Sequence, residues 1–310
     1  DVKENPSFQD CEDIMGFCEG NVFDGVLAIG GGSVMDLAKV VIAHLCLEKS
    51  NIFDLINYNE KFPQKLPSIF VPTTHGTGSE VTMWGTLWHM EEGKKYSISH
   101  KQLYPDVAIL DGNLTKTLPL NISITTVLDA LSHSFESIWN KNSNNRSTKY
   151  AISAISKILQ NVENLKLDPK DVKIRSNLLE ASTISGLAFS NTKTAAAHSM
   201  SYPLTINYGI PHGIASSICL VPLLEYNKNS IISQLDNIMY NNSITYTQLV
   251  QKIKSVSKGV LPSKLRDLGV KESEIDELAN QAFLSERMQN NVKNLNKEDV
   301  KLIYSMYFSN

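Results

Sequence analysis

Residues 26–33 read Val26-Leu27-Ala28-Ile29-Gly30-Gly31-Gly32-Ser33, a short apolar run that ends in three glycines and a serine. Apolar residues then recur at helical spacing between Met35 and Leu45, so the stretch predicts a strand that turns tightly into a helix. Glycines in such a turn let backbone N–H groups approach a phosphate, and the helix N-terminus adds partial positive charge. The stretch matches neither G-x-G-x-x-G nor the Walker pattern. Taken alone, it fits a phosphate-binding loop and a plain strand-to-helix turn equally well.

Two further buried strands are predicted at residues 68–72 and 107–111. The first is followed by a second loop of small residues, 73–80, which contains Thr73, Thr74 and Thr77. These hydroxyls suit the ribose or phosphate oxygens of a dinucleotide, although a hydroxyl-capped helix start is the simpler alternative for this loop alone. The alternation of strand and helix predicts a parallel, doubly wound sheet, in which two such loops at neighbouring strand ends form a nucleotide crevice.

The pattern changes near Pro119, after which apolar residues follow three- and four-residue spacing. Helices are predicted at residues 122–139, 147–165, 173–191, 212–227, 246–257, 273–283 and 297–308. We therefore expect a partial dinucleotide-binding α/β domain at residues 1–118 and an all-helical domain at residues 119–310.

Composition narrows the class of protein. The 310 residues are 42% hydrophobic and 20% charged, which is an ordinary globular profile. A net charge of −3 gives no electrostatic reason to expect a nucleic acid or an anionic membrane as partner. The four cysteines lack metal-ligand or disulfide-framework spacing, and no apolar run is long enough to cross a membrane. We therefore expect reduced thiols and a cytoplasmic location, and the first residues resemble the exit from a strand rather than the start of a domain.

Four side chains in the helical part have the chemistry of metal ligands. Asp129 and His133 are four residues apart and share one helix face, so both can reach a single point. His198 and His212 follow later in the chain. One carboxylate and three imidazoles would suit Fe²⁺ or Zn²⁺. Each residue alone is more typical of a surface or core position, but buried polar side chains in apolar helices need partners, which favours a shared site.

The order of these motifs resembles that of a known family. Gly30, Gly31, Gly32 and Ser33 are followed by Asp36 and Lys39, the threonine loop is flanked by Pro72 and Glu80, and 14 residues separate His198 from His212. Together with Asp129 and His133, these stretches resemble the signatures of the iron-containing (group III) alcohol dehydrogenases over nearly the whole chain. The resemblance implies a Rossmann-like domain and a helical domain with the active site between them. It also implies further β–α units before residue 1 and a homodimer.

The resemblance also implies roles for individual residues. NAD or NADP would be held by Gly30, Gly31, Gly32, Ser33, Asp36, Thr73, Thr74, Thr77 and Lys95. The metal ligands would be Asp129, His133, His198 and His212. Lys95 matches a family lysine near the nicotinamide, whereas Tyr202 replaces a histidine that many members carry there, so we expect Lys95 and Tyr202 to act in catalysis. Fe²⁺ is the expected ion, and Zn²⁺ is an alternative because it binds such sites more tightly.

One branch of the family fits the chain especially well. The stretches at residues 81–88 and 188–203 resemble phosphonoacetaldehyde reductases, which form 2-hydroxyethylphosphonate. Asn191, Lys193 and Trp84 would then contact the substrate, because a phosphonate dianion attracts such donors, although Lys193 also fits a solvated helix end. The alternatives are a general short-chain alcohol dehydrogenase, a lyase like dehydroquinate synthase, a glycerol dehydrogenase relative, and a non-catalytic binding protein.

Overall fold

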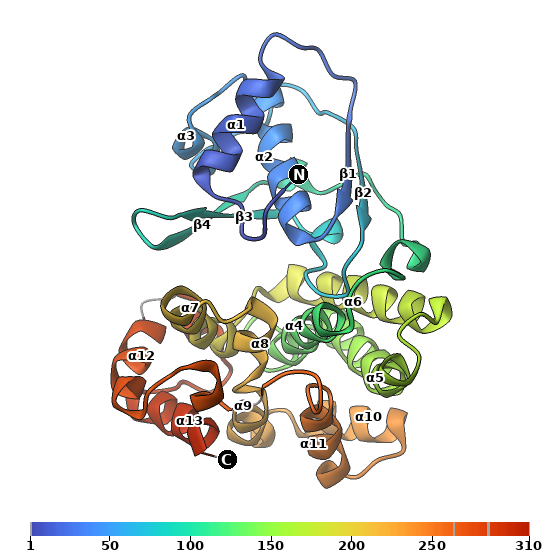
Figure 1. The fold of residues 1–310 in the computed structure, drawn as a ribbon, viewed down its shortest axis with the longest axis vertical. Helices are drawn as coiled ribbons and strands as arrows, with labels where there is room; N and C mark the ends of the chain where they lie inside the picture. The colour runs from blue at the N-terminus through green and yellow to red at the C-terminus, as the bar shows by residue number, and fades with distance from the viewer. Residues whose placement is uncertain (1, 263, 284–285, 310) are drawn as a thin grey trace.

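The computed structural model describes residues 2–262, 264–283 and 286–309. A sheet-containing half and a helical half lie one above the other along the long axis of the molecule (Figure 1). This is the expected Rossmann-like α/β domain followed by an all-α domain. The division at residues 118 and 119 stays a prediction, although the first helix of the helical half begins right after it, at Leu120.

The sheet half contains the three predicted strands, β1 (Val26–Gly30), β2 (Ser68–Pro72) and β5 (Val107–Ala108). They pair in parallel in the order β1-β2-β5, with Gly30 opposite Pro72, which confirms the parallel sheet. The third strand is shorter than the predicted 107–111, because Asp111 caps a 3₁₀ turn through its bond to the Asn113 N–H. Three helices complete this half: α1 (Phe8–Cys18), α2 (Gly32–Leu47) and α3 (Ile52–Ile56).

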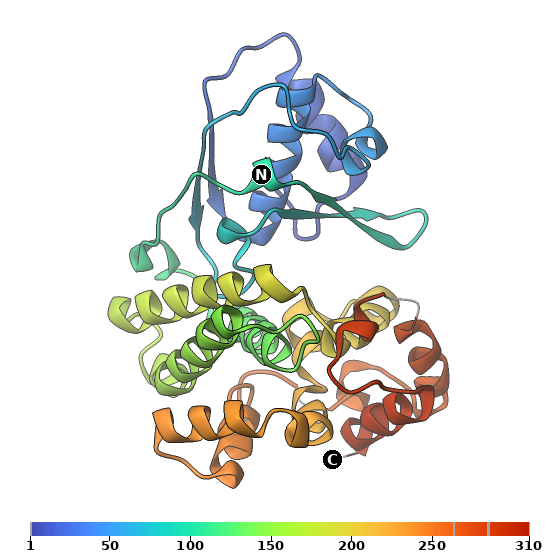
Figure 2. The same ribbon diagram turned by 180° about the vertical axis from the view of Figure 1, so that it is seen from behind.

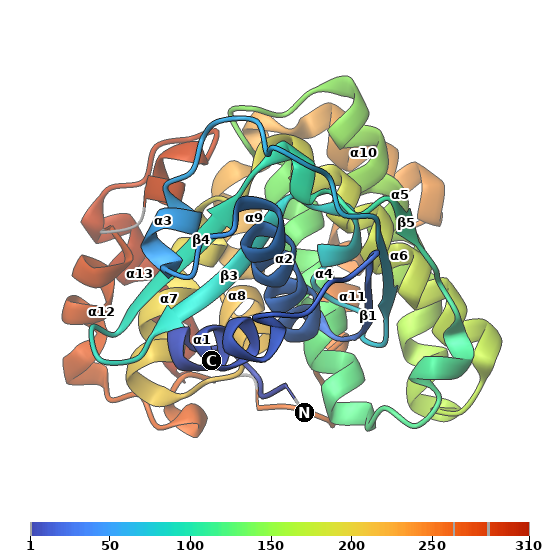
Figure 3. The ribbon, with the colours of Figure 1, turned by 90° about the horizontal axis from the view of Figure 1, so that it is seen from above.

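An antiparallel hairpin, β3 (Trp84–His89) and β4 (Lys94–Ser99), was not predicted from the sequence. Its turn contains Gly93 at φ 59°, a left-handed conformation that glycine adopts readily. Gly85 lets β3 approach α2 closely, because a Cβ there would lie 2.8 Å from the Asp36 carbonyl oxygen. Figure 3, like Figure 1, places the hairpin beside α2 and over the helical half. Residues of both strands line the cleft described below.

The helical half is built around α4 (Leu120–Ile138), whose residues from Val127 to Ile138 are all buried. The other α-helices in the described part of this half are α5 (Asn145–Leu167), α6 (Val172–Thr192), α7 (Ala196–Tyr208), α8 (His212–Ser217), α9 (Leu220–Asn227), α10 (Ile232–Asn242), α11 (Tyr246–Ser255), α12 (Ile275–Ala282) and α13 (Lys297–Ser309). Helices α4, α5 and α6 lie side by side directly below the sheet half (Figure 2). Helix α8 packs against both α4 and α7 in the same half.

Two helix predictions need correction. The single helix predicted at 212–227 is two helices, because Pro222 has no N–H for the Ile218 carbonyl and its ring clashes with a continuing helix. The helix predicted at 273–283 begins as a 3₁₀ turn at Glu272–Glu274 and becomes α-helical only at Ile275. Helix α7, which contains Pro203, was not among the predicted helices. The four cysteines are free and buried, and among the described residues no helix has the length and apolarity to span a membrane.

Candidate functional site

A cleft of about 1610 Å³ is lined by residues of both halves. Fourteen of the predicted site residues lie in its wall: Gly31, Gly32, Ser33, Asp36, Thr74, Thr77, Trp84, Lys95, Asp129, His133, Lys193, His198, Tyr202 and His212. Gly30, Thr73 and Asn191 are not among the lining residues. Residues that are far apart in the sequence thus share one enclosed space.

The sheet side of the cleft is built mainly from backbone. Helix α2 begins at Gly32, and its N-cap residue Gly31 provides no side-chain hydrogen bond, which leaves the first N–H groups available to a ligand. A Cβ on Gly32 would lie 2.5 Å from the Thr77 methyl carbon, and a Cβ on Gly31 would lie 3.1 Å from that of Thr74. The two predicted loops therefore pack against each other, and only glycine allows this approach.

Two predicted cofactor residues lie behind these loops rather than in the cleft wall. Gly30 is the last residue of β1, and its carbonyl accepts a hydrogen bond from the Thr73 N–H at 2.9 Å. Both residues continue the parallel pairing of β1 and β2. They align the two loops, and their contact with a cofactor stays a prediction.

Asp36 belongs to a buried group that we call the lysine cluster, formed by Asp36, Lys39, Ser79 and Thr82. The Lys39 ammonium donates to the Ser79 hydroxyl and carbonyl, to the Thr82 hydroxyl and to the Trp84 carbonyl, at 2.6–3.0 Å. The Asp36 carboxylate accepts from the Ser79 hydroxyl at 2.8 Å and from the Thr86 N–H at 3.1 Å. Burial lowers the pKa of Lys39 to about 8. Asp36 therefore ties α2 to the threonine loop and the hairpin, and its contact with a cofactor stays a prediction.

The four predicted metal ligands, which we call the histidine cluster, converge on the helical side of the cleft. Asp129 and His133 lie one turn apart on α4, His198 lies on α7, and His212 is the first residue of α8. One Asp129 carboxylate oxygen is 3.5 Å from His198 Nε2 and 3.7 Å from His212 Nε2. Ligand atoms of these three residues all lie within 4.8 Å of one another. Asp129 and His133 on α4 thus lie close to the two later histidines, His198 and His212.

His133 completes the cluster from a greater distance. Its Nδ1 atom is 3.9 Å from the second Asp129 oxygen. Its ring stacks on His198 with centroids 4.5 Å apart and on Phe189 with centroids 4.1 Å apart. Stacking on both faces restricts the tilt of the His133 ring beside the other three ligands.

The electrostatics of the cluster favour a cation. Burial raises the pKa of Asp129, but attraction to His133, His212 and His198 outweighs it and holds this pKa below its usual range. Burial lowers the pKa of His133 to about 4 and, with Lys95, lowers that of His212. Burial also lowers the pKa of His198, but attraction to Glu136 and Asp129 outweighs it and raises this pKa. An ionised carboxylate with two neutral imidazoles and the buried His198 ring forms a donor set for a divalent ion.

The unpaired atoms of the cluster fit the same conclusion. His133 Nδ1 and His198 Nε2 are buried and make no hydrogen bond within the described part of the chain. Buried polar atoms in proteins are normally paired, so two such nitrogens facing one carboxylate indicate that a ligand belongs between them. The mixed oxygen and nitrogen donors suit Fe²⁺ or Zn²⁺.

Three contributors to the site were missed in the sequence. Glu136 lies three residues after His133 on the same face of α4 and contacts His198; the spacing 129, 133, 136 was the signal for it. The Ser216 hydroxyl donates to Asp129 at 3.3 Å. Arg287, which is far from the other site residues in the sequence, also lines the cleft and donates to the Thr194 hydroxyl at 3.0 Å. No local sequence pattern predicts this contact.

Two cationic side chains lie near the Tyr202 ring. The Lys95 ammonium is 5.0 Å from the centroid of the Tyr202 ring, and the Arg287 guanidinium carbon is 5.6 Å from it. Lys95 is also 5.5 Å from the Trp88 ring, and burial lowers its pKa to about 8. The Tyr202 hydroxyl makes no hydrogen bond with the described residues, and burial raises its pKa. The predicted pair Lys95 and Tyr202 is thus in direct contact inside the cleft.

The three predicted substrate residues fall into different places. Trp84 lines the cleft and stacks on Phe189 at 6.0 Å between centroids. Lys193 also lines it, as the C-cap of α6 at φ 63°. Asn191 is exposed, and its amide donates to the Leu187 carbonyl one turn earlier. Helical rotation between residues 191 and 193 therefore turns Asn191 away from the cleft.

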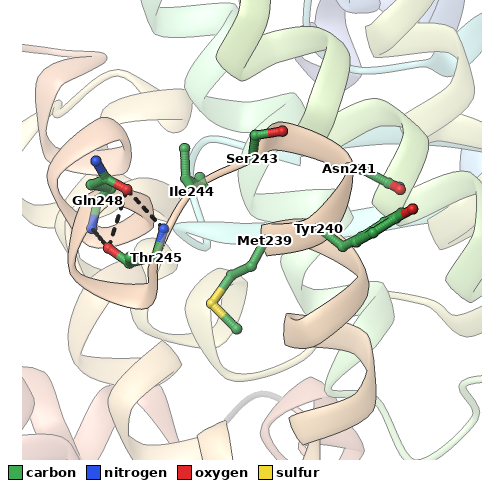
Figure 4. A pocket seen from close by; sticks show the side chains of 7 residues that line it. All are labelled: Met239, Tyr240, Asn241, Ser243, Ile244, Thr245 and Gln248. Carbon is green, nitrogen blue, oxygen red and sulfur yellow. Dashed lines mark hydrogen bonds between the residues drawn. The ribbon is translucent and has the colours of Figure 1, made fainter.

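A second, more open hollow lies at the junction of α10 and α11 (Figure 4). It is lined by Met239, Tyr240, Asn241, Ser243, Ile244, Thr245 and Gln248. Thr245 and Gln248 bond to each other there as the capping box that starts α11. None of its lining residues is charged or a histidine or cysteine, so the hollow lacks groups for acid–base or metal chemistry.

Comparisons with known proteins agree with this geometry. The iron-containing alcohol dehydrogenase family matches residues 1–112, and the C-terminal part of the Fe-containing alcohol dehydrogenase family matches residues 123–308. Long-chain-alcohol dehydrogenase 1 of Geobacillus thermodenitrificans is 30% identical over 100% of this chain and 81% of its own length. NADH-dependent butanol dehydrogenase B of Clostridium acetobutylicum is 29% identical over 98% of this chain and 82% of its own length.

A solved structure shows the same fold. Sulfoacetaldehyde reductase from Bifidobacterium kashiwanohense, in complex with NAD⁺, superposes with a TM-score of 0.90 at 29% identity, over 100% of this chain and 82% of that one. The likeness covers both halves and therefore the cleft between them. The protein is a member of the iron-containing alcohol dehydrogenase family.

Proposed function

We propose that this member of the family is an NAD(P)-linked, metal-dependent aldehyde reductase whose substrate carries an anionic group. Phosphonoacetaldehyde, reduced to 2-hydroxyethylphosphonate, is the proposed substrate. The observation that carries the proposal is one cleft with three components: the glycine and threonine loops, the histidine cluster, and the cations Lys95 and Arg287 near the Tyr202 ring.

The helical side would hold the metal. Asp129, His133, His198 and His212 would bind Fe²⁺ or Zn²⁺, which when bound acts as a Lewis acid on a carbonyl oxygen. The protein fixes these side chains before any ligand arrives, because three of them are almost fully buried and His133 is stacked between Phe189 and His198. Such preorganisation reduces the rearrangement needed during the reaction.

The sheet side would hold the nicotinamide cofactor. The uncapped N-terminus of α2 at Gly31 and Gly32 suits a pyrophosphate, with Thr74 and Thr77 beside it. The nicotinamide, when bound, supplies the hydride. The loops and the histidine cluster face the same cleft, so the chain can position cofactor and carbonyl against each other.

The anionic group of the substrate would be bound by Lys95, with Arg287 also near the Tyr202 ring. The Lys95 ammonium is half-buried, and a desolvated cation attracts an anion more strongly than an exposed one does. Lys193 adds a third positive charge to the same wall. The structural relative from B. kashiwanohense, a sulfoacetaldehyde reductase, supports an aldehyde with an anionic group. The Tyr202 hydroxyl stays protonated because its pKa is raised, so it is available as a proton donor.

An aldehyde panel tests the proposal. Phosphonoacetaldehyde, sulfoacetaldehyde, acetaldehyde and butanal are compared with NADH and NADPH, with Fe²⁺ and Zn²⁺ supplied separately. We expect kcat/KM for the phosphonate to exceed that for the uncharged aldehydes at least about tenfold, the effect of one ion pair of about 1.4 kcal/mol. Equal or better use of the uncharged aldehydes would contradict the anionic substrate. Turnover without net NADH oxidation would instead indicate a lyase.

A general alcohol dehydrogenase is the second candidate, and one observation favours it. Trp84, Phe189 and His133 form a continuous stack that gives the cleft an apolar wall next to the metal ligands. The relatives named for long-chain alcohol and butanol fit such a wall. Arg287→Met separates the two: the variant should lose its preference for the phosphonate if the anion is bound there, and should be unchanged if the apolar wall selects the substrate.

The oligomeric state and the cellular location of the protein remain proposals. A homodimer is supported by apolar side chains that the sheet leaves exposed, among them Leu27, Ile29 and Val107, since such patches are typical of covered surfaces. Light scattering after size exclusion tests it, and a monomer at micromolar concentration would contradict it. A cytoplasmic location is supported by the four free cysteines.

A further inference from the structure

We propose that Glu136 is a positioning residue of the metal site, which holds the His198 ring and selects the tautomer that presents Nε2 to the ion. The inference rests on the histidine cluster as the metal site, but it does not depend on which aldehyde the protein reduces.

One carboxylate fixes His198 at two points. A Glu136 oxygen lies 2.5 Å from His198 Nδ1, and the other accepts a hydrogen bond from the His198 backbone N–H at 3.0 Å. Glu136 is completely buried, and His198 is 1% exposed. Contacts to both the backbone and the ring of one residue restrict the position and the rotation of the imidazole together.

The hydrogen bond from the His198 backbone N–H to Glu136 also holds the start of α7. This helix begins at Ala196, and its N-cap residue Ala195 has no side chain that can bond to the free N–H groups of the first turn. Glu136 supplies that acceptor from α4. The residue that orients the ligand therefore also anchors the helix end that carries it.

The chemistry of the pair determines the tautomer. An ionised carboxylate can only accept hydrogen bonds, so Nδ1 must carry the proton that it shares with Glu136. In the neutral ring, Nε2 then keeps its lone pair. That atom is 3.5 Å from the Asp129 carboxylate and has no hydrogen-bond partner among the described residues. The lone pair is left for a ligand at the centre of the cluster.

The charges agree with this role. Asp129 and Glu136 place two carboxylates in a buried region, next to rings of His133, His198 and His212. A divalent ion would balance these two negative charges. A carboxylate behind an imidazole also makes the ring a stronger donor to the metal.

Glu136→Gln is the direct test. The amide keeps the shape of the side chain but has one acceptor oxygen, so it either loses the bond to the His198 N–H or presents an N–H to Nδ1. The second arrangement places a proton on Nε2 and blocks the ligand atom. We expect the Zn²⁺ affinity of the purified full-length protein, measured by competition with a chromophoric chelator, to fall about 10- to 100-fold.

Matched variants separate positioning from a general loss of stability. Glu80 is 2% exposed and accepts a hydrogen bond from Thr183, away from the histidine cluster. Glu80→Gln neutralises a buried carboxylate in the same way and should leave the Zn²⁺ affinity unchanged. Glu136→Asp keeps the charge with a shorter reach and should recover part of the affinity. The visible spectrum of bound Co²⁺ should change in Glu136→Gln and stay as in the wild type in Glu80→Gln.

Wild-type Zn²⁺ affinity and an unchanged Co²⁺ spectrum in folded Glu136→Gln would overturn the inference. If this variant does not fold, Glu136→Asp decides: weaker binding than in Glu80→Gln supports the role, and equal binding overturns it. His212→Ala tests the site itself. Full metal binding by His212→Ala would refute the histidine cluster, whereas loss in His212→Ala with none in Glu136→Gln would refute only the role of Glu136.

Discussion

The lysine cluster of the sheet half and the histidine cluster of the helical half are both buried and both contain a carboxylate, but they differ in how their polar atoms are paired. The Lys39 ammonium has four acceptors, and each Asp36 oxygen accepts a hydrogen bond. In the histidine cluster, His133 Nδ1 and His198 Nε2 have no such partner in the described chain. The first cluster is closed and joins elements of the fold, whereas the second is open and awaits a ligand.

The difference in hydrogen bonding between the two clusters affects the stability of the protein. A buried polar atom without a partner costs about 1–3 kcal/mol, and the metal-free histidine cluster contains two of them. A bound ion would remove this cost, so metal should stabilise the protein through the second cluster only. The first cluster should contribute to stability with or without metal.

The largest effect is expected from Asp129→Asn. Asp129 is the residue that all three histidines face, so its carboxylate is the centre of the cluster. Loss of the metal should lower kcat/KM for aldehyde reduction by about 1,000-fold or more, since Lewis-acid stabilisation is worth several kcal/mol. In thermal unfolding, Zn²⁺ should raise the midpoint of the wild type and leave that of the variant unchanged.

Lys39→Met should have the opposite profile. Its removal takes away the cation near the buried Asp36 carboxylate and the Lys39 hydrogen bonds to oxygens of Ser79, Thr82 and Trp84, which should lower the free energy of unfolding by about 3–5 kcal/mol. Urea titration of the metal-free protein measures this loss, and the Zn²⁺-induced rise in midpoint should persist. The division between closed and open clusters fails if Lys39→Met abolishes that rise, or if Asp129→Asn destabilises the metal-free protein equally.

Gly32→Ala should weaken cofactor binding. The added Cβ would lie 2.5 Å from the Thr77 methyl carbon, so the two loops would have to separate. Overpacking of this kind costs about 1–3 kcal/mol, which corresponds to a rise in the cofactor KM of about 10- to 100-fold. Gly16→Ala is the matched control, since a Cβ at Gly16 meets nothing within 4 Å. An unchanged cofactor KM in Gly32→Ala would remove the loops from the binding site.

The smallest effect concerns pH. Burial lowers the pKa of Lys95 to about 8 from its ordinary value of 10.5, so Lys95 is charged below pH 8 and loses its charge as the pH rises above it. The KM for sulfoacetaldehyde, whose sulfonate does not titrate in this range, should rise about fivefold between pH 7 and pH 9, as expected for loss of one partly exposed ion pair. The KM for acetaldehyde should stay flat, and Lys95→Met should show no pH dependence. A parallel rise for both aldehydes would exclude Lys95 as the anion site.

Local patterns predicted much of this fold. The glycine turn at residues 30–33 and the core helices were found because their periodicity is local; α4, predicted at 122–139, spans Leu120–Ile138. The β3–β4 hairpin was missed because its strands lack a strict alternation of apolar and polar residues. Asn191 lies outside the lining of the cleft, because a helical residue faces the site or solvent according to rotation, which the sequence does not give within two residues. Its contact with a substrate stays a prediction.

The site could be predicted only in part, because some of its residues are linked by local spacing and others only by the packing of helices. Asp129 and His133 share a helix face, so their pairing follows from spacing. Their meeting with His198 and His212 depends on how α4, α7 and α8 pack, and only the resemblance to a family indicated it in advance. Arg287 reaches Tyr202 from a segment of short turns, which carries no periodic signal.

Anomalous diffraction from crystals of the protein grown with Zn²⁺ and NAD⁺ tests the central claim most directly. We predict one strong zinc peak in the cleft, within about 2.0–2.2 Å of ligand atoms of Asp129, His133, His198 and His212, with the NAD⁺ pyrophosphate at the N-terminus of α2. A catalytically active crystal form with no peak at the histidine cluster, or with zinc bound elsewhere, would contradict it.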